Sequence, residues 1–321
     1  MSFSRRFPSS DFIYSVYTLK NDILCIIFKK FFNSNSPTRL KTWQLSCPIW
    51  YNPNMEKGIF IEPDNAFAEI SRDWKSWAAA FGAGTKMVVG ISGGVDSTCT
   101  AALACRLFGP ENVVGVSLPC DGQKDMSDVD AVFEHLKIKR VTIDIGDACF
   151  ALKNSIENNA ISLTEQCVIN MPARLRMTAL FGVAQCLDGV VINTSNRSES
   201  ICGYDTIFGD SCGCYAPIKN LVKTEIMDLT AWLGVPGKLA HKTPVDGLQP
   251  LTDEQKFGFS YAELDAFIRC PTAVEDGLTK PETAEKIKHM YAANKFKLEI
   301  INIHGPDFSF ASDVFRTGIY S

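Results

Sequence analysis

The chain has 321 residues, enough to bury a full core, which suits one large α/β domain or a domain with an appendage. Its 32 basic and 36 acidic residues nearly balance, so the whole chain has no electrostatic reason to bind nucleic acid. The twelve cysteines include no Cys-x-x-Cys pair, which indicates the reduced thiols of a cytoplasmic protein. The four histidines lie far apart in the sequence, and nothing supports a Ser-His-Asp hydrolase.

The first 54 residues differ from the rest in charge. They carry +5, whereas residues 55–321 carry −9, and the sign changes just before Met55. Three interpretations stay open: translated or disordered sequence outside the catalytic fold, a targeting segment, and an ordered accessory element. We favour the first, because the apolar patch at residues 23–28 is too short for a membrane span and shows no cleavage site. We therefore expect an extension, residues 1–54, and a catalytic domain, residues 55–321.

From Met55 onward the hydrophobic pattern alternates between helices and strands. Residues 65–82 predict an amphipathic helix whose apolar stripe is Phe67, Ile70, Trp74, Trp77 and Phe81. Strands are expected at 87–91, 112–118, 140–145 and 189–193, and helices at 98–107, from about 125 and at 166–187. This order predicts an α/β fold, a doubly wound, Rossmann-like parallel sheet with helices on both faces.

A short string rich in glycine and serine follows the first of these strands. Its members are Ser92, Gly93, Gly94, Val95, Asp96, Ser97 and Thr98. Between a strand and a helix, small residues let backbone N–H groups surround an anion at the helix N-terminus, where the helix dipole favours negative charge. Asp96 adds a carboxylate that suits Mg²⁺ beside that anion. The string lacks the Lys-Ser/Thr pair of a Walker A loop, so it predicts a phosphate site of another class.

The carboxyl ends of the strands predict where the other ligand-binding groups lie. Parallel sheets bind ligands at these ends, so the segments that begin at Ser92, Leu118 and Thr194 should converge on one cleft. Glu199 lies close behind Thr194 and could complete the Mg²⁺ shell that Asp96 begins, since oxygen ligands from two loops suit a metal that bridges phosphates. The competing interpretation of Glu199 is a carboxylate that stabilises a helix N-terminus.

Basic residues and one long loop complete the candidate site. Arg174 and Arg176 are two residues apart on a helix, so they lie on different faces and only one can enter a given cleft. Lys219 and Lys223 follow a glycine-rich loop and are candidates for neutralising phosphate charge, although exposed lysines are more often simply solvated. Residues 244–259 indicate a mobile loop that could close over a reactive intermediate, with an ordinary surface loop as the alternative.

Taken in order, these motifs resemble NAD synthetase, a family of the ATP-pyrophosphatase superfamily. The likeness covers about residues 60–300 and rests on the phosphate loop, Leu118-Pro119 with Gln123 and Asp125, Ala173-Arg174-x-Arg176-Met177, Thr194 with Asn196-Arg197-Ser198-Glu199, Gly203-Tyr204 with Gly209-Asp210, Ala216-Pro217, and Pro244-x-Asp246-Gly247-Leu248. The resemblance implies that the carboxylate of deamido-NAD attacks the α-phosphate of ATP and pyrophosphate leaves. Ammonia then attacks the adenylate, and NAD and AMP are released. Such a ligase needs no nucleophilic side chain, because the substrate supplies the attacking oxygen.

The resemblance also implies individual roles. The residues that would bind ATP are Ser92, Gly93, Gly94, Val95, Asp96, Ser97, Thr98, Thr194 and Lys223. The residues that would hold Mg²⁺ are Asp96 and Glu199. The residues that would bind the dinucleotide are Arg174, Asp210 and Lys297. Four positions depart from the family pattern, namely Ile207, Cys214, Val245 and Phe296; they bear on the affinity and specificity for the dinucleotide and not on the phosphate and metal chemistry.

The nitrogen source and the assembly state are implied by the same resemblance. Glutamine-using members carry a glutaminase domain before the synthetase, but fewer than 95 residues precede Ser92. We therefore expect ammonia, either free or delivered by a separate protein. A cytoplasmic homodimer without membrane or nucleic-acid partners is implied as well. Two other functions stay open: another adenylating ATP pyrophosphatase, of the tRNA-modifying type, and a nucleotide-binding regulatory protein that has lost catalysis.

Overall fold

The computed structural model describes residues 12–18, 24–30, 59–82, 84–120, 126–242, 252–300 and 303–316. The chain divides into two compact units, residues 1–51 and 52–321. In the first unit, β1 (Phe12–Thr18) and β2 (Leu24–Lys30) pair antiparallel, with Phe12 opposite Lys30. The interpretation of residues 1–54 as an extension that the catalytic fold does not need stays a prediction.

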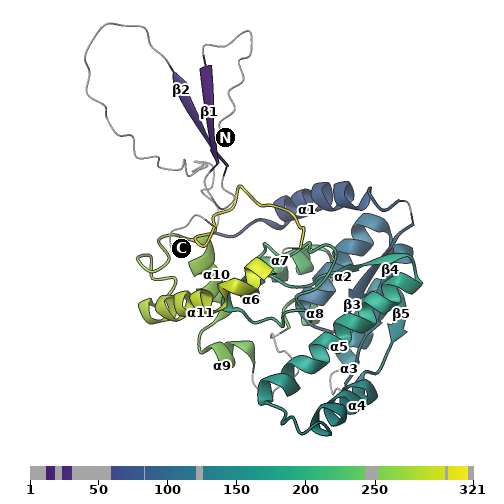
Figure 1. Ribbon diagram of the computed structural model, residues 1–321. Coiled ribbons are helices and arrows are strands. Elements are labelled where there is room, and N and C mark those ends of the chain that lie inside the picture. Colours follow the sequence, from purple (N-terminus) through teal and green to yellow (C-terminus); the bar gives the residue numbers. More distant parts are fainter. Residues whose placement is uncertain are drawn as a thin grey trace, which may run out of the picture. The chain divides into compact units, whose positions relative to one another are not determined.

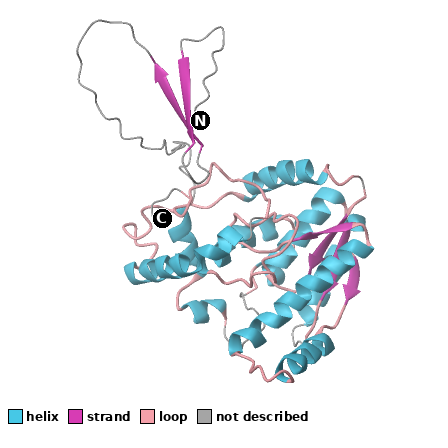
Figure 2. Cartoon of the chain, viewed as in Figure 1, coloured by secondary structure: helices cyan, strands magenta, loops and turns pink. Residues whose placement is uncertain are grey.

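The second unit is built on a parallel sheet, which has four strands within the described residues (Figures 1 and 2). The strands are β3 (Lys86–Gly90), β4 (Val113–Ser117), β5 (Lys139–Thr142) and β6 (Gly189–Ile192), in the order β5-β4-β3-β6. After β5 the chain crosses to the other side of β3 to form β6. This change of direction confirms the predicted doubly wound α/β fold and places a ligand crevice at the carboxyl ends of β3 and β6.

Helices follow the strands and cover both faces of the sheet. The longer ones are α1 (Pro63–Ala78), α2 (Val95–Phe108), α3 (Met126–Leu136), α4 (Gly146–Glu157), α5 (Glu165–Cys186), α7 (Lys223–Trp232), α10 (Tyr261–Arg269) and α11 (Pro281–Ile300). The short ones are the 3₁₀ turn η1 (Pro110–Asn112), α6 (Arg197–Cys202), α8 (Gly237–Ala240) and α9 (Asp253–Phe257). Among the helices described, none has both the length and the hydropathy that crossing a membrane requires.

The central strand β3 holds both layers of the core together. Val88 packs with Leu180 and Ala184 of α5, the long helix in front of the sheet in Figure 1. Met87 and Val89 point the other way, into a larger cluster with side chains of α1, α2, α3 and α7. Successive side chains of a strand alternate between its faces, so five residues are enough to anchor helices on both sides. Burial of each valine contributes about 1.5–3 kcal/mol.

A further apolar cluster binds the later helices to one another. It contains Ile201 of α6, Phe257 of α9, Phe267 of α10 and Ile287 of α11. Val314 of the C-terminal segment, residues 303–316, packs into the same cluster. The short helix α6, which follows β6, is therefore held between the sheet and these helices.

The first predicted helix is shorter than expected. It ends at Ala78, and Phe81, which we expected on its buried stripe, has 48% of its surface exposed. The backbone turns after Ala79, and Gly82 adopts a φ of +90°, a conformation that glycine reaches without steric cost. Phe81 still contacts Trp77, with ring centroids 4.6 Å apart.

The prediction of a mobile loop at residues 244–259 was wrong for the second half of that segment. Residues 253–257 form α9, which begins with a capping box between Thr252 and Gln255. Phe257 and Phe259 are buried, with their rings stacked 5.6 Å apart, because they fill the apolar cluster between the later helices. The first half of the segment, residues 244–251, lies outside the described residues.

Candidate active site

The carboxyl ends of three strands bring the predicted segments to one edge of the sheet. Ser92, Leu118 and Thr194 follow β3, β4 and β6 within two residues. Because β3 is the parallel neighbour of both other strands, the three segments begin side by side. The three segments therefore start at one edge of the sheet, with the glycine-rich loop in the middle, and the single cleft that they should share stays a prediction.

The glycine-rich loop has the geometry of an anion cradle. Gly93 has a φ of +78°, and a Cβ atom there would lie 3.1 Å from the Cβ of Asp128. Only glycine satisfies both the conformation and the close approach to α3. The hydroxyls of Ser92 and Ser97 lie 3.1 Å apart, and Ser97 donates to the carbonyl of Gly94, so the serines hold the loop closed on itself. The first backbone N–H groups of α2 have no partner within that helix and suit a phosphate.

Asp96, Glu199 and Lys223 meet beside this loop and form what we call the Asp96–Lys223–Glu199 cluster. The Nζ atom of Lys223 lies 2.7 Å from Oδ2 of Asp96 and 2.9 Å from Oε1 of Glu199. The lysine side chain is 1% exposed and each carboxylate 19%. Burial by itself would lower the pKa of Lys223, but the two carboxylates outweigh it and hold that pKa above its ordinary value. Burial raises the pKa of Glu199 to about 7. The charge of Asp96 adds to this rise, and the shared ammonium of Lys223 opposes it.

The cluster fits Mg²⁺ by the chemistry of its donors. Both carboxylates contact the same ammonium nitrogen, so their oxygens converge on one region next to the phosphate loop. Hard oxygen donors are what Mg²⁺ prefers, and it usually takes only one or two carboxylates together with phosphates and water. Within the described residues no group of three or more His, Cys, Asp and Glu side chains could hold a metal, so phosphate oxygens would have to complete the shell.

Two neighbouring residues to which the sequence analysis gave no role, Asn196 and Tyr261, keep the cluster in place. Asn196 caps α6 by accepting the backbone N–H of Glu199, and its Nδ2 donates to Oδ1 of Asp96 at 3.0 Å. The ring of Tyr261 lies 5.1 Å from the Nζ of Lys223. Asn196 belonged to the recognised motif, which could have indicated its capping role. No sequence motif indicated a role for Tyr261, because it contacts Lys223, which is far away in the sequence.

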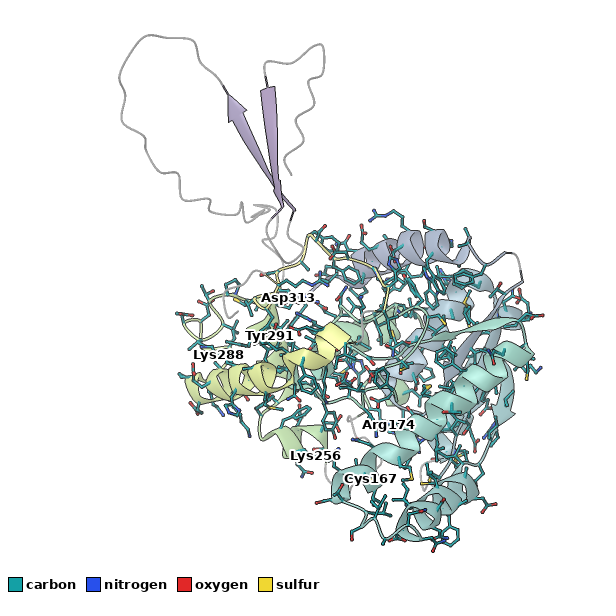
Figure 3. The ribbon with its side chains drawn as sticks, viewed as in Figure 1. Cys167, Arg174, Lys256, Lys288, Tyr291 and Asp313 are labelled. Atoms are coloured by element: carbon teal, nitrogen blue, oxygen red, sulfur yellow. The ribbon has the colours of Figure 1, made fainter. Side chains whose placement is uncertain are left out.

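The two arginines of α5 separate as the helix geometry predicts. Arg176 donates from Nε to the carbonyl of Leu118 at 3.1 Å, at the end of β4. Arg174, labelled on α5 in Figure 3, donates from Nε to the carbonyl of Ile207 at 3.2 Å. Arg174 therefore reaches the segment 203–210, whereas Arg176 supports the edge of the sheet.

The segment 203–210 gathers the other two residues expected to bind the dinucleotide. Lys297 donates to the carbonyls of Gly203 and Asp205 at 2.6 and 2.7 Å and lies 3.3 Å from Oδ1 of Asp205. Asp210 accepts the backbone N–H of Thr206 at 3.0 Å. Asp210 thus lies in this segment, and Arg174 and Lys297 contact it. A cavity of about 220 Å³ beside the segment is lined by Lys297 and Asp205.

Lys219 does not join the phosphate site. The Nζ of Lys219 donates to the carbonyl of Ile303 in the C-terminal segment, so of the two candidate lysines the structure brings only Lys223 to the loop. Cys212 and Cys214 belong to no metal-binding group among the residues described. Gln123, Asp125 and the motif at 244–248 lie outside the described residues.

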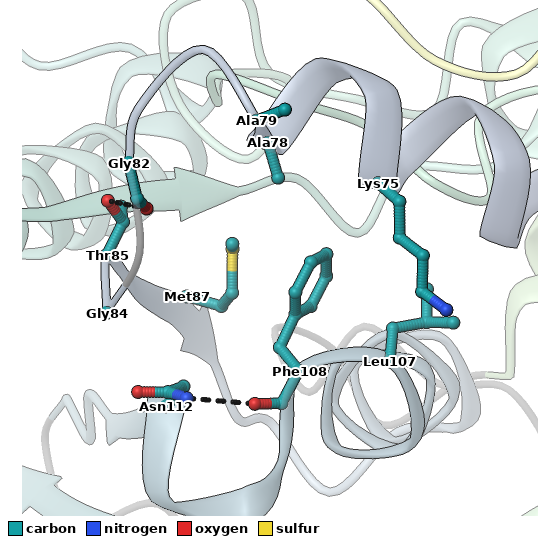
Figure 4. Close-up of a pocket in the computed structure, with 10 residues that line it drawn as sticks. All are labelled: Lys75, Ala78, Ala79, Gly82, Gly84, Thr85, Met87, Leu107, Phe108 and Asn112. Carbon is teal, nitrogen blue, oxygen red and sulfur yellow. Dashed lines mark hydrogen bonds between the residues drawn. The ribbon is translucent and has the colours of Figure 1, made fainter.

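A larger cavity, about 300 Å³, lies at the opposite edge of the sheet (Figure 4). The end of α1, the start of β3 and the end of α2 surround it, with Lys75, Thr85 and Asn112 as its polar side chains. None of the motif residues lines it. Since ligands of such sheets bind at the carboxyl ends of the strands, the candidate active site is the edge with the phosphate loop.

The sequence profile described as NAD synthase matches residues 74–301, which is most of the chain. The chain belongs to the NAD synthase family. The matched residues include the whole parallel sheet, the phosphate loop and the Asp96–Lys223–Glu199 cluster. The chain is a ligase that forms a carbon–nitrogen bond, as the sequence resemblance implied.

Curated relatives agree with the family assignment. The NH(3)-dependent NAD(+) synthetase of Pyrococcus furiosus is 37% identical over 183 residues, which cover 57% of this chain and 70% of the relative. The enzyme of the same name from Syntrophomonas wolfei is 36% identical over 238 residues, which cover 73% of this chain and 91% of the relative. Neither a tRNA-modifying pyrophosphatase nor an inactive nucleotide binder is favoured by these matches.

Solved structures share the fold of this chain. The NMN synthetase from Francisella tularensis superimposes with a TM-score of 0.66 at 29% identity, covering 77% of this chain and all of that one. The NH3-dependent NAD synthetase from Campylobacter jejuni gives a TM-score of 0.60 at 24% identity, over 76% of this chain and 99% of that one. The second likeness supports the Rossmann-like fold alone.

Proposed function

We propose that this protein amidates deamido-NAD with ammonia, with ATP as the co-substrate, and releases NAD, AMP and pyrophosphate. The observation that carries the proposal is the Asp96–Lys223–Glu199 cluster directly beside a glycine-rich loop at a helix N-terminus. That arrangement suits the transfer of an adenylyl group, in which charge builds on a departing pyrophosphate. The relatives named NH(3)-dependent support ammonia as the nitrogen source.

In this proposal the loop and α2 bind the phosphates of ATP. The N–H groups of Ser92, Gly94 and Thr98 already donate within the loop and helix. The backbone N–H groups of residues 93 and 95–97 would therefore surround the pyrophosphate end, and the dipole of α2 favours its negative charge. Thr194, at the end of β6, and Lys223 contact ATP from the neighbouring strand and from α7. Mg²⁺, held by Asp96 and Glu199, would supply charge neutralisation on the phosphate oxygens.

The carboxylate of deamido-NAD is the nucleophile, so the chain has only to orient it and exclude water. Arg174 and Lys297 contact the segment 203–210, which contains Asp210 and which we assign to the wall of the dinucleotide pocket. Adenylation turns the unreactive carboxylate into an acyl group with a good leaving group. Ammonia then attacks the acyl carbon, and the bond to AMP breaks.

We also propose that the enzyme works as a homodimer in the cytoplasm. Apolar side chains on α4, on the turn after it and on α5 are exposed: Phe150 by 66%, Ile161 by 58% and Val168 by 38%. In this proposal an interface between two copies of the chain covers these exposed side chains. Light scattering of the wild type and of Phe150→Asp measures this directly, and a monomeric wild type would rule the dimer out.

A mononucleotide is the second candidate substrate, because the relative from Francisella tularensis is named an NMN synthetase. Cys214 and Phe296 stand where dinucleotide-binding residues are expected, and the ammonium of Lys297 already contacts Asp205. Fewer free polar groups in this pocket would weaken discrimination for the larger substrate. Initial rates with deamido-NAD and with nicotinic acid mononucleotide, each with ATP and ammonium, decide between the two.

The central experiment measures NAD formation by the purified chain with ATP, Mg²⁺ and deamido-NAD. Ammonium and glutamine are supplied in parallel reactions, and Glu199→Gln provides the matched inactive control. NAD with ammonium alone is the expected result. If neither donor gives NAD or the corresponding mononucleotide product while ATP still binds, the proposed reaction is wrong.

A further inference from the structure

Asp265 is a buried carboxylate on α10 that receives hydrogen bonds from two other helices. Its Oδ2 accepts the backbone N–H of Thr224 at 2.7 Å and the hydroxyl of Thr224 at 2.8 Å, both at the start of α7. Its Oδ1 accepts the hydroxyl of Ser198 in α6 at 2.6 Å. The side chain has no exposed surface. A buried charge is tolerated only where donors satisfy it, and here three converge on one group.

Each of these donors is the chain neighbour of a residue in the Asp96–Lys223–Glu199 cluster. Ser198 precedes Glu199 in α6, and Thr224 follows Lys223 in α7. The hydroxyl of Ser198 also accepts the backbone N–H of Lys223 at 2.9 Å, which joins the two helices directly. A shift of either helix end would therefore change the distance between the side chains of Lys223 and Glu199.

The start of α7 depends on these contacts, because of the backbone N–H groups there its own Glu225 accepts only that of Val222, at 2.9 Å, and leaves the next two N–H groups to other helices. The N-cap residue is Val222, whose side chain has no hydrogen-bond acceptor. Ser198 and Asp265 accept the first two N–H groups of the helix in its place. A negative charge at this end also interacts favourably with the helix dipole. Asp265 thus caps α7 from another helix and ties that cap to α6.

We infer that Asp265 is a positioning residue that sets the distance between Glu199 and Lys223 and so tunes the metal and phosphate site. The inference rests on the proposed function in its assignment of Asp96 and Glu199 to a divalent cation. Asp265 itself does not touch the cluster and acts through Ser198 and Thr224. Residues that orient metal ligands in this way commonly change metal affinity about 10- to 100-fold when they are replaced.

The test measures metal affinity, with Mn²⁺ as the probe and α,β-methylene-ATP as a nucleotide that cannot release pyrophosphate. Asp265→Asn keeps the volume but offers one acceptor oxygen where the donors need two. We expect the Mn²⁺ dissociation constant, measured by electron paramagnetic resonance, to rise about tenfold. Ser198→Ala should raise the Mn²⁺ dissociation constant by a similar factor. The double variant should bind Mn²⁺ no more weakly than the more impaired of the two single variants, because both substitutions break the same connection.

Thr279→Val is the matched control. Thr279 is 1% exposed and donates its hydroxyl to the carbonyl of Glu263, so it supports α10 without contacting α6 or α7. This variant should lower the melting temperature while the Mn²⁺ dissociation constant stays within twofold of wild type. If Asp265→Asn and Ser198→Ala behave like this control, Asp265 is merely structural and the inference is wrong. Ser198→Ala decides alone if Asp265→Asn does not fold.

The Mn²⁺-binding experiment can fail or succeed independently of the amidation assay. A wild type that binds Mn²⁺ with the analogue, and loses that binding in the variants as expected, supports the positioning role even if it makes no NAD. A wild type that binds no Mn²⁺ under these conditions overturns the metal assignment and this inference together.

Discussion

The Nζ atom of Lys223 lies 2.7 Å from Oδ2 of Asp96, although 127 residues separate the two in the chain. The first turn of α2 supplies the carboxylate, and the first residue of α7 supplies the ammonium. Two helix N-termini therefore meet at one point beside the phosphate loop. The ammonium of Lys223 is therefore held in the site before any substrate binds.

Asp96→Asn should abolish most of the activity while the fold persists. The amide cannot bind a divalent cation as a carboxylate does, and it loses the ion pair with Lys223. We expect turnover to fall roughly a thousandfold or more. Initial rates across a range of Mg²⁺ concentrations, with circular dichroism as the check on folding, measure the effect. Near-normal turnover in this variant, or in Glu199→Gln, contradicts the metal assignment.

Lys223→Met should make the stability of the protein depend on Mg²⁺. Removing one partner of a buried ion pair costs about 3–5 kcal/mol, because the carboxylates of Asp96 and Glu199 lose their counter-charge. A divalent cation can replace that charge, so Mg²⁺ should raise the melting temperature of this variant more than that of the wild type. Lys219→Met is the control, since that lysine bonds to the carbonyl of Ile303 instead. An equal Mg²⁺ response in both variants counts against the shared cation site.

Deleting residues 1–54 should leave activity unchanged. The phosphate loop, the cluster and the whole parallel sheet belong to the unit of residues 52–321. The charge of the chain also changes sign near this boundary. Solubility and kcat/KM of the truncated and full-length chains provide the comparison. An insoluble or inactive truncation shows that the segment belongs to the catalytic fold.

Asp313→Asn should destabilise the protein strongly. Arg197, two residues before Glu199, donates to both carboxylate oxygens of Asp313 at 2.7 and 3.1 Å, and the Asp313 side chain is 5% exposed. Asp313, labelled in Figure 3, lies in the C-terminal segment. Leaving the guanidinium buried without its partner costs about 3–5 kcal/mol. Urea unfolding measures it, with Asp307→Asn as the control, because the exposed pair of Asp307 with Arg316 should contribute little.

Thiol labelling should separate buried from exposed cysteines. Burial raises the pKa of Cys99 and of Cys105 to about 12, so at pH 8 their reactive thiolate forms are scarce. Cys186 is exposed at the end of α5. Among the cysteines of the described side chains, iodoacetamide followed by peptide mass spectrometry should find Cys186 modified first, with Cys99 and Cys105 unmodified in the folded protein. Rapid labelling of Cys99 in native protein is inconsistent with the packing of α2.

Local patterns made much of the fold predictable. The apolar runs of β3, β4 and β6 and the amphipathic stretch of α1 were found because strand and helix periods are visible within a few residues. Their ends were less certain: Phe81 fits the helical spacing, yet the chain turns at Ala79, before reaching it. The helix α9 was missed although Thr252 and Gln255 form a capping box, because glycines and acids around it resemble a loop.

The sequence by itself determined the phosphate loop, since Gly93, Asp96 and the flanking strand and helix form a site from contiguous residues. Only the tertiary structure decided that Lys223 rather than Lys219 reaches that loop, and that Asp265 caps the helix on which Lys223 lies. Contacts over a hundred residues depend on how whole helices pack, and helix packing depends on buried surfaces from many segments at once. No short stretch of sequence contains that information.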